Sequence, residues 1–64
     1  MPLLDEYYNR HDNPPQDPAK KILFAVINDL TGRSGFDGCW DGMRKEDQEE
    51  LLNTNLRKIQ KQMS

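Results

Sequence analysis

The sequence predicts an all-α protein, a helical hairpin that carries a short helical arm at its N-terminus. Apolar residues recur at helical spacing in residues 18–30 and 44–63, and a glycine-containing loop joins these segments at residues 33–43. The chain has only 64 residues, with a mean hydropathy of −0.99, and its single cysteine allows no internal disulfide. Because so small and polar a chain buries a limited core by itself, we expect the hairpin to complete its core by oligomerisation.

Residues 1–17 are predicted to form the arm and a linker, and residues 18–64 the hairpin domain. Within residues 2–10, four apolar positions share one face of a helix: Leu3, Leu4, Tyr7 and Tyr8. A helix of this length is marginal by itself, so this segment is either a docked helix or an arm. The adjacent Pro14 and Pro15 exclude a helix from the linker that follows.

The central helix is expected at residues 18–31, and its sequence marks both ends. Asp17 is a suitable N-cap, Pro18 fits the first helical position, and Gly32 fits the stop position. Six apolar residues form a broad stripe along this helix: Ala19, Ile22, Leu23, Val26, Ile27 and Leu30. Phe24 lies off the stripe, which predicts a helix covered on more than one side. A buried strand at residues 22–27 is the alternative, but no second strand is visible to pair with it.

The last helix, residues 44–63, has an apolar seam of the coiled-coil type, which Leu51 widens. The seam residues are spaced four, three and four apart: Leu52, Leu56, Ile59 and Met63. This seam can face the preceding helix of the same chain or another copy of the chain. We therefore predict an oligomer or partner interface formed by the arm, the off-stripe aromatic residue and the seam, namely Leu3, Leu4, Tyr7, Tyr8, Phe24, Leu52, Leu56, Ile59 and Met63.

The loop at residues 33–43 repeats one pattern, an aromatic residue followed by Asp-Gly, beginning at Phe36 and again at Trp40. In one interpretation the Asp-Gly pairs form turns and the two aromatic rings close the open end of the hairpin. In the other, Trp40 stacks on a nucleotide-like ligand while Arg33 and the glycine-rich backbone hold its negative charge. The candidate ligand-binding residues are Arg33, Ser34, Gly35, Phe36 and Trp40.

Composition and spacing argue against several functional classes. Nine basic residues face eleven acidic ones without a basic block, which disfavours nucleic acid as a partner. No metal-ligand spacing or cofactor motif is present, and neither His11 nor Cys39 has a sequence neighbour placed for catalysis, so we expect no enzyme, metal or cofactor. The longest apolar run, residues 22–27, is far shorter than the ~20 residues of a membrane span. A lone thiol without a signal-peptide pattern predicts a cytoplasmic protein.

One composite pattern extends over residues 22–59. It consists of an apolar helix, the sequence Thr31-Gly32-Arg33-Ser34-Gly35-Phe36, Trp40, and an acidic helix start at residues 46–50. The pattern resembles small helical proteins of phage and prophage origin, and this resemblance implies a viral accessory protein that disarms a host defence by binding. We therefore expect a non-enzymatic, phage-type protein that oligomerises and binds or inhibits a host protein. The alternative is an oligomeric sponge that sequesters a nucleotide-like small molecule near residues 33–43.

Overall fold

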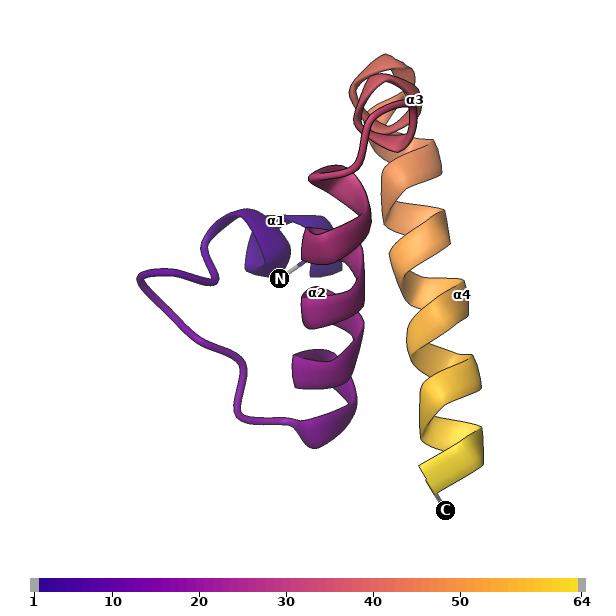
Figure 1. Cartoon of the computed structure of the whole chain (residues 1–64). Helices are drawn as coiled ribbons and strands as arrows, with labels where there is room; N and C mark the ends of the chain where they lie inside the picture. The colour runs from indigo at the N-terminus through magenta and orange to yellow at the C-terminus, as the bar shows by residue number, and fades with distance from the viewer. Residues whose placement is uncertain (1, 64) are drawn as a thin grey trace.

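The computed structural model describes residues 2–63, and the regular structure of this part of the chain is helical, without strands (Figure 1). Four helices follow one another: α1 (Leu3–Tyr8), α2 (Pro18–Thr31), α3 (Phe36–Gly42) and α4 (Lys45–Met63). The prediction of an all-α protein is confirmed, and residues 22–27, where a strand is the alternative, lie inside α2. None of the described helices is both long and apolar enough to cross a membrane.

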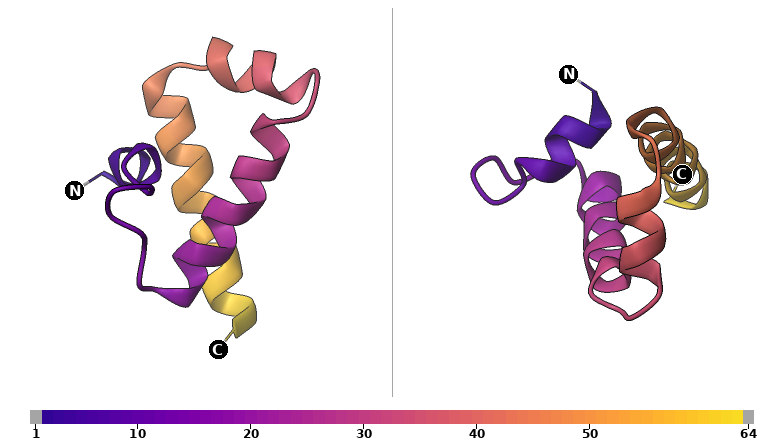
Figure 2. Two further views of the ribbon diagram at one scale, coloured as in Figure 1. Left: turned by 60° about the vertical axis from the view of Figure 1, so that its left-hand side comes forward. Right: turned by 90° about the horizontal axis from the view of Figure 1, so that it is seen from above.

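The two long helices, α2 and α4, pack against each other and run in opposite directions, while the short α3 bridges their ends (Figure 1, Figure 2). The first helix, α1, lies against α4, and α3 contacts α2. Residues 9–17 leave α1, loop away from the helices and return to the start of α2. Of the two options for the N-terminal segment, the structure therefore has the docked helix.

The short helix α1 is held in place by side chains from distant parts of the chain. The backbone N–H groups of Leu3 and Leu4 donate to the carboxylate of Glu49 on α4, at 3.1 and 2.8 Å. The first N–H groups of a helix have no partner inside the helix, so Glu49 caps α1 from a different element. An ion pair of 2.8 Å between Lys20 and Glu6 joins α1 to α2.

The bounds of α2 agree with the signals that mark its ends. The side chain of Asp17 accepts a hydrogen bond of 2.9 Å from the backbone N–H of Ala19, and Gly32 is the C-cap. The buried face differs from the predicted stripe, because Phe24 turns inward while Ile22 and Val26 remain about half exposed. The stripe is wider than the surface that α4 and α1 cover, and its outer edge is left in solvent.

The predicted loop at residues 33–43 is wrong, because α3 occupies residues 36–42. The chain turns at Gly35, whose φ of 96° is a conformation that L residues rarely adopt, and the helix starts directly afterwards. Phe36 and Trp40 are four residues apart and thus share one face of α3, which packs onto the core. Burial of this aromatic face outweighs the low helix propensity of Gly38 and Gly42.

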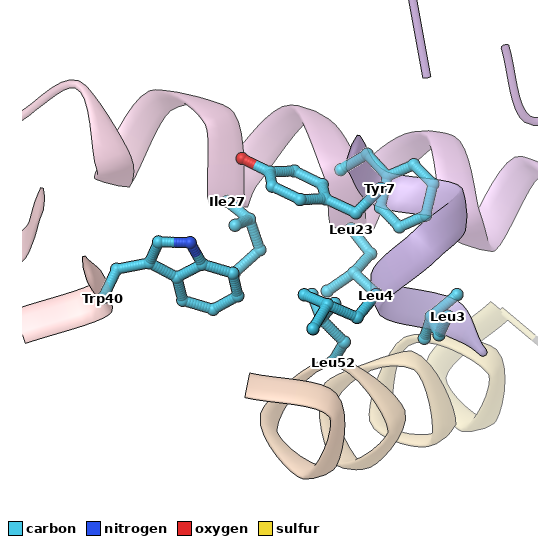
Figure 3. Close-up of a cluster of buried hydrophobic side chains, with 8 residues drawn as sticks. Leu3, Leu4, Tyr7, Leu23, Ile27, Trp40 and Leu52 are labelled. Atoms are coloured by element: carbon cyan, nitrogen blue, oxygen red, sulfur yellow. The ribbon is translucent and has the colours of Figure 1, made fainter. Parts of the chain in front are cut away.

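All four helices contribute to one apolar core (Figure 3). Tyr7 of α1 lies at its centre, with its ring edge-on to the rings of Phe24 and Trp40 at centroid distances of 5.4 and 5.9 Å. The one buried polar side chain among the described residues, Gln48, donates to the carbonyl oxygen of Trp40 at 2.6 Å. The buried apolar cluster consists of Leu3, Leu4, Tyr7, Leu23, Phe24, Ile27, Trp40 and Leu52.

Candidate functional site

An apolar groove of about 420 Å³ runs between α2 and α4 on the side that α1 leaves uncovered. The side chains that form each wall are four residues apart along the helix. They are Ile22, Val26 and Leu30 on α2, and Leu51, Asn55 and Ile59 on α4. Such steps place side chains on one face of each helix. The floor and one end are formed by side chains that also contribute to or pack on the core: Leu23, Ile27 and Phe36.

The outer rim of the groove is the most exposed apolar surface on α2. Ile22 is 45% exposed and Val26 is 50% exposed, although each is an aliphatic residue on the helix stripe. Asn55 is the one polar side chain in the lining, and its amide nitrogen donates to the carbonyl oxygen of Leu51 at 2.7 Å. None of the lining side chains is titratable, so the groove is suited to binding apolar surface and not to acid–base chemistry.

The candidate ligand-binding residues are not gathered around one cavity. Trp40 is only 3% exposed, and its indole N–H donates to the hydroxyl of Tyr8 at 3.3 Å. Its ring packs in the core and is not offered to a ligand as a stacking face. Arg33 is exposed and forms an ion pair of 3.1 Å with Asp29. Phe36 belongs to the apolar groove, while Ser34 and Gly35 lie exposed in the turn before α3.

The predicted interface residues separate into two groups. Five of them are buried inside the single chain, where they form its core and are not offered to a partner: Leu3, Leu4, Tyr7, Phe24 and Leu52. Tyr8 and Met63 are more than half exposed, and Leu56 and Ile59 are partly buried against the core. Ile59 is thus the predicted interface residue that also lines the groove.

Sequence reasoning did not assign the groove's α2 wall to an interface, although the signal was present. The broad stripe on α2 has more apolar positions than one packing partner covers, and Leu51 widens the seam of α4 on the same side. What the sequence does not encode locally is the pairing of these two surfaces, because residues 22–30 and 51–59 come together only through the packing of α2 on α4.

The residues with reactive side chains are dispersed. Cys39 is exposed on α3, and His11 lies in the linker after α1. Within residues 2–63, no three acidic, histidine or cysteine side chains are grouped so that they could hold a metal ion.

Comparison of the chain with known proteins found no relative. No protein-family model, no curated protein and no solved structure matches the chain. The resemblance to phage and prophage proteins therefore depends on the sequence pattern of residues 22–59 alone and stays a prediction.

Proposed function

We propose that the protein is a non-enzymatic binding protein that docks an apolar helix in the groove between α2 and α4. The observation that carries the proposal is the half-exposed pair Ile22 and Val26, one helical turn apart on the rim of an apolar groove. Burying apolar surface contributes roughly 25 cal/mol per Å², so covering two half-exposed aliphatic side chains stabilises a complex by about 2 kcal/mol. A helix lying along the groove removes both side chains and the groove floor from water.

A helix is a better occupant than a strand because of the spacing in both walls. Side chains in the walls recur every four residues, on helices that run in opposite directions. The ridge of a third helix, with apolar residues three and four positions apart, packs between two such rows. The absence of charge from the lining means that no ionised group has to be desolvated when the helix binds.

We further propose that a second copy of the chain is one such occupant, so that the protein oligomerises. The surface supports this because the apolar groove has an apolar rim, where Ile22 and Val26 are about half exposed and available to a second copy. A two-fold axis places the rim of each copy in the groove of the other and gives a core of two α2–α4 pairs. The chain exposes 4683 Å², whereas a compact monomer of this mass exposes roughly 4,200 Å².

The expected strength of this association is modest. A standard interface buries about 800 Å² per partner, which is about a sixth of the exposed surface of this chain. The groove and its rim provide less than that, so we expect a dimer that dissociates on dilution. A weak dimer also leaves the groove accessible to a competing helix from another protein.

The wider proposal is that this competing helix belongs to a host protein, as expected of a phage-type accessory protein that counters a host defence. The sequence pattern of residues 22–59 and the accessible groove support it. The sponge for a nucleotide-like molecule is the second candidate, and it needs Trp40 to leave the core before its ring can stack on a ligand. We therefore favour the docking of a helix.

The oligomeric state tests the proposal through a double substitution on the rim, Ile22→Gln with Val26→Gln. Both positions are exposed and helical, so we expect an unchanged circular dichroism spectrum. In light scattering coupled to size-exclusion chromatography, the wild-type mass should rise with concentration, whereas the double variant should stay at the mass of one chain. Met63→Gln is the matched control, because Met63 is 51% exposed and lies outside the groove lining.

Two outcomes would count against the proposal. A wild-type protein that keeps the mass of one chain at millimolar concentration has no self-association through this face. Capture from host lysate then tests whether a host protein binds in the groove. A host protein retained by the wild type and by Met63→Gln, but not by the double variant, supports a docking groove. Equal retention by all three proteins means that the groove does not bind it.

A further inference from the structure

A second depression, of about 390 Å³, lies on the opposite side of α2 from the groove. The linker of residues 9–17 forms one wall with Arg10, His11 and the pair Pro14 and Pro15, and α2 forms the other with Lys21 and its neighbours. Adjacent prolines restrict the backbone of the linker, so the depression is present before any ligand arrives.

The lining of this depression carries positive charge without an acidic partner. Arg10 and Lys21 supply this charge, and no aspartate or glutamate lines the depression. Among the described residues, neither Arg10 nor Lys21 forms an ion pair, whereas Lys20 and Arg33 each have a carboxylate partner. The chain as a whole has a net charge of −2, so this local excess of cations is not a consequence of composition.

The guanidinium of Arg10 is held in a fixed orientation by neutral groups. It donates to the carbonyl oxygen of Tyr7 and to the amide oxygen of Asn28, each at 2.7 Å, and it stacks on the ring of Tyr7 at 4.1 Å. These bonds use two of its five N–H donors. A fixed arginine with unused donors loses little conformational entropy when it binds an oxyanion.

The remaining lining is apolar and comes from both walls. Pro14 and Pro15 line the depression from the linker, and Phe24 and Ala25 line it from α2. We propose that this depression binds a small organic anion, with a phosphate or carboxylate group on Arg10 and Lys21 and an apolar body against the prolines. The site is independent of the groove, because the two are lined by different faces of α2.

The head group and the apolar body can be tested separately with simple probes in two-dimensional ¹H–¹⁵N NMR titrations. Phenyl phosphate and benzoate should shift amide signals of residues 10–13 and 21–28, and inorganic phosphate should bind at the same place but more weakly. Benzyl alcohol, which has no charge, should not shift these signals. The two anions with rings distinguish a phosphate site from a carboxylate site by their relative affinities.

Lys21→Gln should weaken the binding of phenyl phosphate by about fivefold, the effect of removing one exposed charge pair. Lys58→Gln removes a charge from an exposed position on α4, outside the depression, and should leave the affinity unchanged. The rim variant Ile22→Gln with Val26→Gln should also bind phenyl phosphate normally, so failure of the groove proposal leaves this one intact.

Three results would overturn the site. The first is the absence of shifts with every probe at millimolar concentration. The second is an equal loss of affinity in Lys21→Gln and Lys58→Gln, which indicates unspecific attraction to positive charge. The third is equal binding of inorganic phosphate and phenyl phosphate, which removes the role of the apolar wall.

Discussion

At the scale of the residue, Glu49 links the N-terminal end of α4 to the start of α1. Its two carboxylate oxygens accept hydrogen bonds from the backbone N–H groups of Leu3 and Leu4, and the side-chain amide of Asn53 also donates to it. Desolvation raises the pKa of Glu49, but the hydrogen bonds from Leu4, Asn53 and Leu3 together outweigh it and lower the pKa below the ordinary 4.5. The folded protein therefore favours the ionised carboxylate.

Glu49→Gln should destabilise the protein by about 1 kcal/mol at pH 7, since the charge is lost while one acceptor oxygen remains. A lowered pKa in the folded state contributes stability above pH 4.5, and this contribution disappears as the pH falls through the lowered pKa. Urea unfolding at pH 7 and pH 3 measures the difference. We expect it to shrink at pH 3, and Glu50→Gln, one residue away and exposed, should have little effect at either pH. An equal loss at both pH values would exclude a role for the charge.

At the scale of the element, α2 and α3 show what the sequence encodes and what it does not. The cap at Asp17 and the stop at Gly32 are local signals, and they predict the bounds of α2 correctly. The same local logic assigns turns to the Asp-Gly pairs of residues 36–42, where the structure has α3. Packing of Phe36 and Trp40 on the core stabilises this helix, and that contact depends on residues far away in the sequence.

Two glycines, one in the turn before α3 and one inside this helix, give predictions of opposite sign. Gly35→Ala should destabilise the protein by about 1–2 kcal/mol, because its φ of 96° is strained for any residue with a Cβ. Gly38→Ala should stabilise it by about 0.5–1 kcal/mol, because this glycine is helical and exposed, with no atom near an added Cβ. Thermal unfolding of both variants checks the pair. Destabilisation by Gly38→Ala would mean that residues 36–42 are not helical in solution.

At the scale of the whole molecule, the four helices share one apolar core, and none of them has a separate core. Leu52 is fully buried between elements, and Tyr7, Phe24 and Trp40 bring three further helices to it. Sequence periodicity identifies most of these residues as apolar positions of helices but assigns several of them to a partner. The assignment to a partner follows from the small size of the chain. The alternatives, in which residues 2–10 dock as a helix and the aromatic rings of residues 36 and 40 close the hairpin, place these residues in the core of one chain.

A shared core predicts a single cooperative unfolding transition. The signal of Trp40 fluorescence reports on α3 and α1, and far-ultraviolet circular dichroism reports mainly on the longer α2 and α4. Their urea midpoints should coincide in the wild type, and both should fall together in Leu52→Ala, which costs about 2–5 kcal/mol. An earlier midpoint by fluorescence alone would show that the short helices detach before the long ones.

The candidate sites could be predicted only in part. Ile59 on the seam and the wide stripe of α2 indicate an apolar surface, but the groove needs two helices to meet. The anion site could not be predicted, because Arg10 in a polar linker and Lys21 on a helix do not belong to one sequence motif. Their proximity depends on how the linker of residues 9–17 returns to α2.

The contact between Leu3 and Glu49 joins residues 46 positions apart, so it can form only after this part of α4 has been synthesised. During synthesis Leu3 and Leu4 are made before Glu49, the α4 residue whose carboxylate accepts hydrogen bonds from their backbone N–H groups. Helix α1 is therefore made before the helix that holds it in place, and closing so long a segment slows folding relative to contacts between neighbours. Until then its apolar face is open to chaperones, to other nascent chains and to proteases.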